Sequence, residues 1–341
     1  MIFKTSLSMK KNYNNSRRQF LAAGSLASLG LLFAQPAAFA FGSAKPDSKF
    51  GGVQIGCITY SFRSMPGSID EIIGYLVQSG ISATELMGDA VEEYAGKPVN
   101  PVQMRWTPGQ PRPTLTDEQR AAMKKYQEDV KAWRETVSMD KFKEVRAKLD
   151  KAGISVYAYK PNAFSPNNSD AEVEYALRSA KVLGAKSVTV ELPTDPKQTQ
   201  RLGDLGAKHG VYFGYHTHTQ VKDTVYDEAL AQSPYNSINL DAGHYIAVGA
   251  PHNTASLLAL IEAKKDRITS MHIKDRTSKE NGAKNLVWGT GETPLKELLT
   301  AMKKNKYKFP ATIELEYDIP AGSDAVTEVK KCVEYAKAIL V

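Results

Sequence analysis

From residue 51 to the C-terminus, short runs of β-favouring residues alternate with helical patterns, and this alternation limits the choice of fold more than any other feature. Glycine stands at or near the end of four helical patterns, just before the next run, in QSGISATEL, KAGISVYAY, LGAKSVTVE and KHGVYFGYH. A glycine there ends a helix in a left-handed turn without steric cost. Eight such units predict a parallel sheet that closes into a (β/α)8 TIM barrel. The expected strands are residues 53–59, 81–86, 155–159, 187–192, 212–216, 237–240, 268–273 and 311–315.

An open, doubly wound sheet is the alternative arrangement of alternating strands and helices. Sheets of that kind that bind dinucleotides carry G-x-G-x-x-G directly after the first strand, and this chain has no such motif there. The pair Gly289 and Gly291 comes late in the chain and lacks the third glycine. We therefore expect one barrel domain over residues 51–341, because single α/β barrels commonly have this length.

The interval between the second and third expected strands is the longest. Residues 88–140 contain a proline-rich piece, residues 100–113, and then a charged helical pattern over residues 116–135. A long insertion after a barrel strand lies over the catalytic face. We expect a lid or a substrate wall in which Trp106 contacts the substrate. The alternative is an extra helix that only pads the surface.

The first 40 residues have the pattern of an export signal. Residues 16–21, SRRQFL, resemble the twin-arginine motif of Tat substrates, and an uncharged Ala/Leu/Gly run ends in AFA at residues 38–40. The apolar run over residues 21–33 has 13 residues, including two Gly and two Ser, which is short of the roughly 20 apolar residues that a membrane span needs. We expect Tat export to the periplasm, with the signal either cleaved or retained.

Charge and cysteine usage narrow the function classes. The formal net charge is +7, and removing the five basic residues that precede residue 41 leaves +2 for the mature chain. A charge this small gives no basic field to collect phosphates, so we expect no nucleic-acid partner. Cys57 and Cys332 form no CxxC motif; they either meet near the termini or remain two packed thiols. The sequence predicts no membrane span in the mature chain and is compatible with an oligomer.

Histidine and acidic residues gather where the last four expected strands end. Four of the six histidines lie there, and residues two apart on a strand share a face. In a barrel, these strand ends form the catalytic face. Crowded imidazoles and carboxylates favour a divalent cation that neutralises them, and this ligand mixture suits Mn, Co, Zn or Fe rather than a thiolate-rich structural zinc site. The residues are His216, His218, Asp241, His244, His272, Lys274, Glu314 and Glu316.

The motifs GYHTH, NLDAGH, MHIKD, WGTGETPLKELL and LEYD occur in this order between residue 212 and residue 318. Together they resemble the xylose isomerase-like barrels, specifically the sugar phosphate isomerase/epimerase group, which also includes endonuclease IV. The resemblance runs from about Val53 to the C-terminus. It implies a barrel with one divalent metal ion held by side chains of strands five to eight. Carried over by position, the implied ligands are His216, Asp241, His272 and Glu316.

This chain departs from that pattern on strand five. The sugar epimerases of the group have Glu where this chain has His216, so the strand-five ligand is either His216 or His218, and Glu191 on strand four is a further alternative. In those enzymes the carboxylates of strands five and eight resemble the acid/base pair. Their epimerisation mechanism therefore does not transfer whole to this chain.

The expected function is that of an exported, metal-dependent sugar isomerase or epimerase that abstracts an α-proton through a metal-stabilised enediolate. Lys274 is the leading proton carrier, and its alternative role is a structural ion pair with a nearby carboxylate. His244 either orients Asp241 or contacts substrate. The candidate catalytic residues are Lys274, Glu191 and Lys160, and the candidate substrate contacts are His218, His244, Glu85, Glu314 and Trp106.

Two other functions use the same site. A lyase or hydratase acting on a 3-keto-glycoside would expel the glycosidic oxygen after α-proton removal, and a sugar-binding protein would turn nothing over. The expected partner is a small-molecule sugar or keto-sugar, and export argues against a phosphorylated one. DNA repair does not fit, because of the export signal, the low mature charge and the larger ligand set that a multi-metal site requires.

Overall fold

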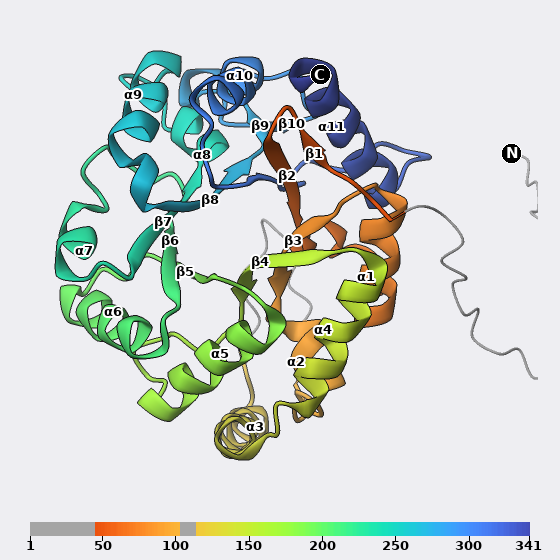
Figure 1. The fold of residues 1–341 in the computed structure, drawn as a ribbon. Helices are drawn as coiled ribbons and strands as arrows, with labels where there is room; N and C mark the ends of the chain where they lie inside the picture. The colour runs from red at the N-terminus through yellow and green to blue at the C-terminus, as the bar shows by residue number, and fades with distance from the viewer. Residues whose placement is uncertain (1–44, 103–113) are drawn as a thin grey trace, which may run out of the picture. The chain divides into compact units, whose positions relative to one another are not determined.

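The computed structural model of the protein describes residues 45–102 and 114–341. The expected signal segment and Trp106 lie outside these residues. Within them, eight parallel strands close into a barrel, because β2 pairs with both β3 and β11 (Figure 1). The predicted TIM barrel is confirmed, and each strand overlaps its expected range. The barrel strands are β2 (Val53–Ile58), β3 (Ala83–Met87), β4 (Ser155–Lys160), β5 (Ser187–Glu191), β6 (Tyr212–His216), β7 (Asn236–Asp241), β8 (Ile268–Ile273) and β11 (Ala311–Ile313).

Helices surround the barrel and bury the outer faces of its strands (Figure 1). Strands covered on both faces have nearly continuous burial, as in β7, where all six residues are buried. Short antiparallel pairs supplement the barrel: β1 (Lys49–Phe50) with β2, and β9 (Asp275–Arg276) with β10 (Asn285–Leu286). The helices are α1 (Ile69–Gln78), α2 (Gly88–Tyr94), α3 (Asp117–Thr136), α4 (Asp140–Ala152), α5 (Asp170–Leu183), α6 (Pro196–His209), α7 (Asp227–Gln232), α8 (Ala242–Ala247), α9 (Thr254–Lys264), α10 (Leu295–Asn305) and α11 (Ala325–Leu340).

The glycines that the sequence placed before four strands do end helices in the left-handed conformation. Gly153, Gly184 and Gly210 follow α4, α5 and α6 directly, with φ of +79°, +86° and +67°. Gly80 is separated from the end of α1 by one residue, Ser79, and has φ of +80°. Each turn returns the chain to the barrel within a few residues, which explains the regular spacing of the strands.

The insertion between β3 and β4 contributes α2 and α3. Helix α3 lies beside α5 at the outer edge of the barrel (Figure 1). Its buried Arg134 donates to Glu172 on α5 at 2.9 Å and to the carbonyl oxygen of Asn162 at 2.7 Å. These contacts fix the C-terminal half of α3 against the chain that follows β4.

Strand register brings the expected site residues into line. Glu191 on β5 is the Cα partner of His216 on β6, and Asp241 on β7 is the partner of His272 on β8. His272 in turn pairs with Thr312 on β11, two residues before Glu314. Parallel neighbours in register present their side chains at one level, so the ends of five adjacent strands form a single cluster.

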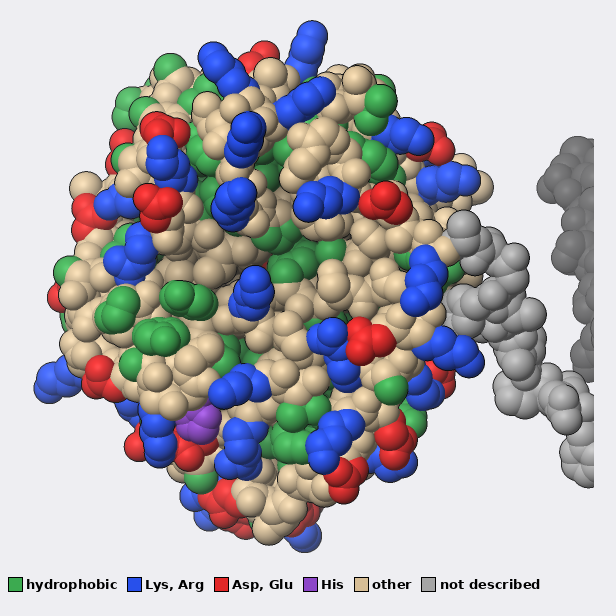
Figure 2. Space-filling model, viewed as in Figure 1, with side chains coloured by type: hydrophobic (Ala, Val, Ile, Leu, Met, Phe, Trp, Pro, Cys, Tyr) green, Lys and Arg blue, Asp and Glu red, His purple; other side chains and the backbone are tan. Residues whose placement is uncertain are grey.

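The distribution of surface charge and the state of the two cysteines can also be compared with the sequence. Figure 2 shows Lys and Arg side chains scattered among acidic and uncharged ones on one face, with no continuous basic stripe there. Cys57 and Cys332 are both buried free thiols, so of the two alternatives the structure has packed thiols. Over the described residues, none of the helices has the length and apolar character to cross a membrane.

Candidate metal and catalytic site

Three buried side chains converge at the C-terminal ends of β6, β7 and β8. Nε2 of His216 lies 4.0 Å from Oδ2 of Asp241, and Nδ1 of His272 lies 3.9 Å from the same oxygen. One ligand atom from each of the three lies within 4.8 Å of the others, close enough for all three to bind one metal ion. The structure thus brings together three of the four residues that the family resemblance implied as ligands.

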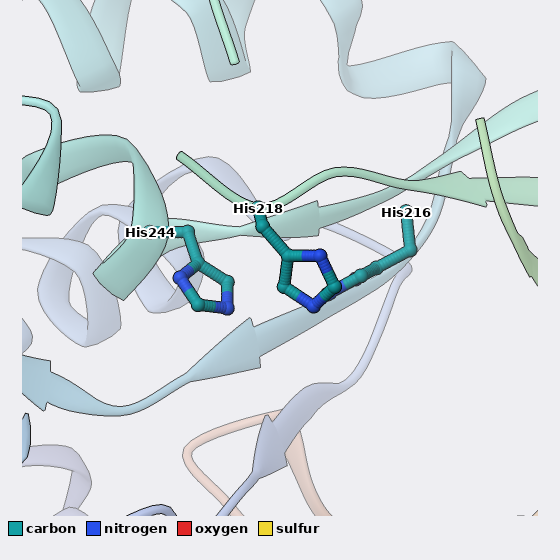
Figure 3. A group of neighbouring side chains, drawn as sticks. All are labelled: His216, His218 and His244. Atoms are coloured by element: carbon teal, nitrogen blue, oxygen red, sulfur yellow. The ribbon is translucent and has the colours of Figure 1, made fainter. Parts of the chain in front are cut away.

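A second group of three histidines lies just outside the first. His216 and His218 come from the end of β6 and the chain after it, and His244 comes from α8 (Figure 3). Their candidate ligand nitrogens also lie within 4.8 Å of one another. His216 belongs to both groups and is buried, whereas His218 belongs only to the outer group and is exposed. Of the two alternatives for the strand-five ligand, His216 is the one that faces Asp241 and His272.

Asn239 orients the ring of His216. Its side-chain nitrogen donates to Glu85 at 3.0 Å and to Ser270 at 2.7 Å, so its oxygen accepts the hydrogen bond from Nδ1 of His216 at 2.8 Å. This network assigns the proton of His216 to Nδ1 and leaves the lone pair of Nε2 toward Asp241. Burial, with the charge of His272, lowers the pKa of His216 to about 4, which keeps the imidazole in the neutral form that binds metals.

His272 lies between two carboxylates. Its Nε2 lies 2.9 Å from Oε2 of Glu85, and its Nδ1 lies 3.0 Å from Oε2 of Glu314. Burial alone would lower the pKa of His272, but the two carboxylates outweigh it and raise the pKa to about 10. Glu85, which we expected to contact substrate, is fully buried and lies against His272. Its position suits orienting that ring, with Nδ1 facing Glu314 at 3.0 Å and Asp241 at 3.9 Å.

Lys274 occupies the centre of the carboxylates. Its Nζ lies 2.9 Å from Asp241, 2.5 Å from Glu314 and 2.9 Å from Glu316. Burial would lower the pKa of Lys274, but the three carboxylates outweigh it and the net shift is upward. A proton-accepting role for Lys274 therefore stays a prediction. The structure has the alternative, a buried network of ion pairs.

The charges of this cluster fit a divalent cation. Within residues 45–102 and 114–341, the four carboxylates of Glu85, Asp241, Glu314 and Glu316 contact only two cationic side chains, Lys274 and His272. Among the described residues, the buried Oδ2 of Asp241 forms an ion pair with Lys274 at 2.9 Å and accepts no well-aligned hydrogen bond. An excess of buried negative charge around an oxygen with spare acceptor capacity is what a bound dication neutralises.

Glu314 and Glu316 both reach the cluster, at different depths. Glu314 is buried and contacts both His272 and Lys274. Glu316, the ligand implied by the family resemblance, is 21% exposed and reaches Lys274 and, at 3.9 Å, Nε2 of His244. Both carboxylates lie beside Nζ of Lys274, which marks a position for a cation.

His244 on α8 and Arg276 on β9 contact the cluster from its side. The backbone N–H of His244 donates to Oδ1 of Asp241 at 2.7 Å, which fixes that carboxylate at the start of α8. Arg276 donates to Nδ1 of His244 at 2.5 Å. Burial lowers the pKa of His244 to about 3, with smaller contributions from Lys274 and Arg276. Arg276 was not among the expected site residues, although it follows His272 and Lys274 at intervals of two residues.

Lys160, Glu191 and His218 form the outer rim of the mouth. Nζ of Lys160 lies 3.3 Å from Glu191, and Nδ1 of His218 lies 3.5 Å from the other oxygen of Glu191. The side chains of Glu191 and His218 are 50% and 52% exposed, so both can meet a ligand that enters from solvent. The rim therefore holds two of the three expected proton carriers.

Comparison with known proteins places the chain in one family of TIM barrels. Residues 119–338 match the family described as xylose isomerase-like TIM barrel. No curated protein matches the chain significantly.

Solved structures share the fold at low sequence identity. A sugar phosphate isomerase/epimerase from Parabacteroides distasonis ATCC 8503 is 17% identical with a TM-score of 0.56, covering 90% of this chain and 100% of its own. The IolI protein with a binding zinc atom is 14% identical with a TM-score of 0.58, covering 84% and 99%. The apo form of 3-keto-D-glucoside 4-epimerase from E. coli is 13% identical with a TM-score of 0.54, also covering 84% and 99%.

Proposed function

The chain belongs to the xylose isomerase-like TIM barrel family, and on that premise we propose that it is a metal-dependent isomerase or epimerase of a sugar or keto-sugar. The observation that carries the proposal is the buried group of His216, Asp241 and His272 with its excess of carboxylate. Isomerisation and epimerisation both begin with removal of a proton beside a carbonyl group. Such a reaction needs a site that stabilises negative charge on oxygen next to a group that accepts the proton.

The residues present fit one divalent ion, Mn, Co, Zn or Fe. His216 through Nε2, Asp241 through Oδ2 and His272 through Nδ1 would hold it, with Glu314 or Glu316 as the fourth ligand. His272 would lose the proton on Nδ1 as the ion binds, because only a neutral imidazole is a ligand. When bound, such an ion polarises a sugar carbonyl and its neighbouring hydroxyl, which acidifies the proton between them. The zinc atom bound in the IolI structure supports a metal in this fold.

Side chains of the protein supply the base, the electrostatic stabilisation and the contacts to substrate. Glu191 is the proposed base, because it is exposed at the rim and lies beside Lys160 and His218, which can hold or relay its proton. Lys274 stays protonated among its carboxylates, so its proposed role is electrostatic, beside the oxygen on which charge develops. His244, held by Arg276, has Nε2 3.2 Å from Nζ of Lys274, and its proposed role is to contact a sugar hydroxyl at the same mouth.

The test is proton exchange with solvent. The protein is loaded with each of the four metals and incubated in deuterated water with free aldoses and ketoses, then with 3-keto-glucosides, and the sugars are followed by NMR. We expect deuterium at the carbon next to the carbonyl in at least one sugar, only in the presence of metal. Tight sugar binding without any deuterium incorporation would replace the proposal with a sugar-binding protein.

A lyase or hydratase acting on a 3-keto-glycoside is the second candidate. The observation in its favour is a cleft that opens beside Lys160 and Glu191 and continues away from the metal group. The same NMR experiment separates the two functions. Release of an aglycone together with an unsaturated keto product identifies the lyase, whereas deuterium incorporation without loss of a group identifies the isomerase or epimerase.

We also propose that the protein is exported through the Tat system, on the basis of residues 16–21 alone. Replacing Arg17 and Arg18 together with lysine should keep the protein in the cytoplasm. Cell fractionation followed by immunoblotting measures this directly. If the double variant still reached the periplasm, export through the Tat system would be contradicted.

A further inference from the structure

A large cleft leaves the barrel mouth between α3 and the chain segments that follow β4 and β5. Its volume is 1150 Å³, and Lys160 and Glu191 of the outer rim are among its lining residues. Pockets of about 300–1,000 Å³ hold drug-sized ligands, so this space exceeds what one sugar ring needs. A substrate whose reacting ring lies at the metal group can therefore extend past Glu191 into the cleft.

The wall of the cleft on the α3 side is held firmly in place. Arg134, which lines the cleft, is 5% exposed and donates to Glu172 at 2.9 Å and to the carbonyl oxygen of Asn162 at 2.7 Å. Asn168 donates to the same oxygen of Glu172 at 3.0 Å. This buried network ties α3, α5 and the segment after β4 into one rigid surface, which lowers the entropy cost of binding a ligand.

The lining has the chemistry of a surface that binds uncharged hydroxyl groups. Residues with amide side chains line the cleft from two sides, Gln127 on α3 and Asn162 and Asn167 after β4, and an amide can both donate and accept hydrogen bonds. Tyr126 adds an aromatic side chain. Five basic and five acidic side chains line the cleft, so their charges balance. A phosphorylated or otherwise anionic ligand would favour a basic excess, which this lining lacks.

We propose that this cleft is a subsite for the second, non-reacting sugar unit of a neutral glycoside. The substrate is then a disaccharide or a similar glycoside rather than a free monosaccharide. This inference rests on the proposed function, because it assumes that the reacting ring lies at the metal group. It also assigns a role to α3: the helix forms the far wall of the substrate site.

Binding measurements test the subsite without requiring turnover. Isothermal titration calorimetry on the zinc-loaded protein compares glucose with three neutral disaccharides, cellobiose, maltose and trehalose. We expect at least one disaccharide to bind about tenfold more tightly than glucose, the gain that one or two net hydrogen bonds provide. The double variant Gln127→Ala/Lys131→Ala removes two cleft-lining side chains one helical turn apart on α3 and should reduce this preference to about twofold or less.

The matched control lies on the same helix. Lys125→Ala/Asp129→Ala removes an exposed pair, also four residues apart, whose side chains do not line the cleft, and it should keep the full preference. Failure of all three disaccharides to bind more tightly than glucose would overturn the subsite, as would an unchanged preference in the Gln127→Ala/Lys131→Ala variant. These outcomes are independent of deuterium exchange: the subsite can fail while exchange succeeds, and a disaccharide preference can persist in a protein that exchanges no deuterium.

Discussion

The inner and outer parts of the barrel mouth hold their charges in different ways. In the inner part, Lys274 and His272 lie among buried carboxylates at 2.5 to 3.0 Å. At the outer rim, Glu191 has longer contacts of 3.3 and 3.5 Å with Lys160 and His218 and is half exposed. Tightly paired buried charges resist a change of protonation, whereas solvent-facing groups exchange protons readily. The comparison supports our proposal that the inner part binds the cation and the rim transfers the proton.

Neutralising Asp241 should have the largest effect. Asp241→Asn keeps an oxygen for the hydrogen bond from the backbone of His244 but removes the charge toward which His216 and His272 turn. We expect metal binding to be lost and solvent deuterium exchange to fall by at least about a thousandfold, because a bound cation supplies several kcal/mol of charge stabilisation. Metal analysis of the purified variant and NMR exchange rates measure both effects.

The matched control is Asp266→Asn, an exposed aspartate that precedes the N-terminal end of β8 and has no metal-site contact among the described residues. It should keep full metal occupancy. Circular dichroism checks that both variants remain folded. A folded Asp241→Asn protein with a full equivalent of metal would show that the inner part does not bind the cation in the way we describe.

Replacing the rim carboxylate should separate proton transfer from metal binding. Glu191→Gln keeps the shape of the side chain but cannot accept a proton. We expect deuterium exchange to fall by about 10²- to 10³-fold, within the usual contribution of a general base, while metal affinity stays unchanged. The exposed Glu93→Gln on α2 is the control and should leave both quantities unchanged. If Glu191→Gln exchanged deuterium at the wild-type rate, the base would have to lie elsewhere.

Lys274 allows a test of the charge balance in the inner part. Lys274→Met leaves Asp241, Glu314 and Glu316 without their shared cation, so the metal-free variant should lose about 3 kcal/mol of unfolding free energy. Bound metal should recover part of this loss, because it neutralises the same carboxylates. Chemical denaturation with and without metal gives both values.

The control for this variant is Lys125→Met on α3, whose exposed ion pair with Asp129 should contribute no more than about 1 kcal/mol. The decisive quantity is the stabilisation that metal adds to each protein. If metal stabilised Lys274→Met no more than the wild-type protein, Lys274 and the metal would not share the same carboxylates.

The barrel was predictable from local sequence because each of its parts is local. A run of β-favouring residues, a helical pattern and a glycine at the helix end recur within a few tens of residues, and the structure has the left-handed glycines where this pattern placed them. The clustering of strand ends followed from the barrel itself. His216, Asp241 and His272 lie together because parallel register aligns residues at the ends of neighbouring strands.

The partners of these residues were harder to predict because they come from across the barrel. Glu85 on β3 contacts His272 on β8, 187 residues later in the chain, and no periodicity within one strand relates the two. The ion pairs of Lys274 depend on three carboxylates from two strand ends, which decide whether the amine is neutral or charged. Asn239 and Arg276 are different, because each lies two residues from a recognised site residue and could have been found by strand alternation.

Of these variants, Asn239→Ala should have the smallest effect, and it tests one specific feature, the orientation of the His216 ring. Because its side chain fixes the proton of His216 on Nδ1, Asn239→Ala should free the ring to rotate and weaken metal binding by about ten- to a hundredfold, the usual effect of losing such a partner. Ser270→Ala is a matched control: it removes another hydrogen bond of Asn239, at 2.7 Å, without touching His216. Competition with a chromophoric chelator measures both affinities. Equal weakening in the two variants would mean that the polar network only supports the barrel interior, whereas weakening confined to Asn239→Ala would identify the orientation of His216 as the property that the metal requires.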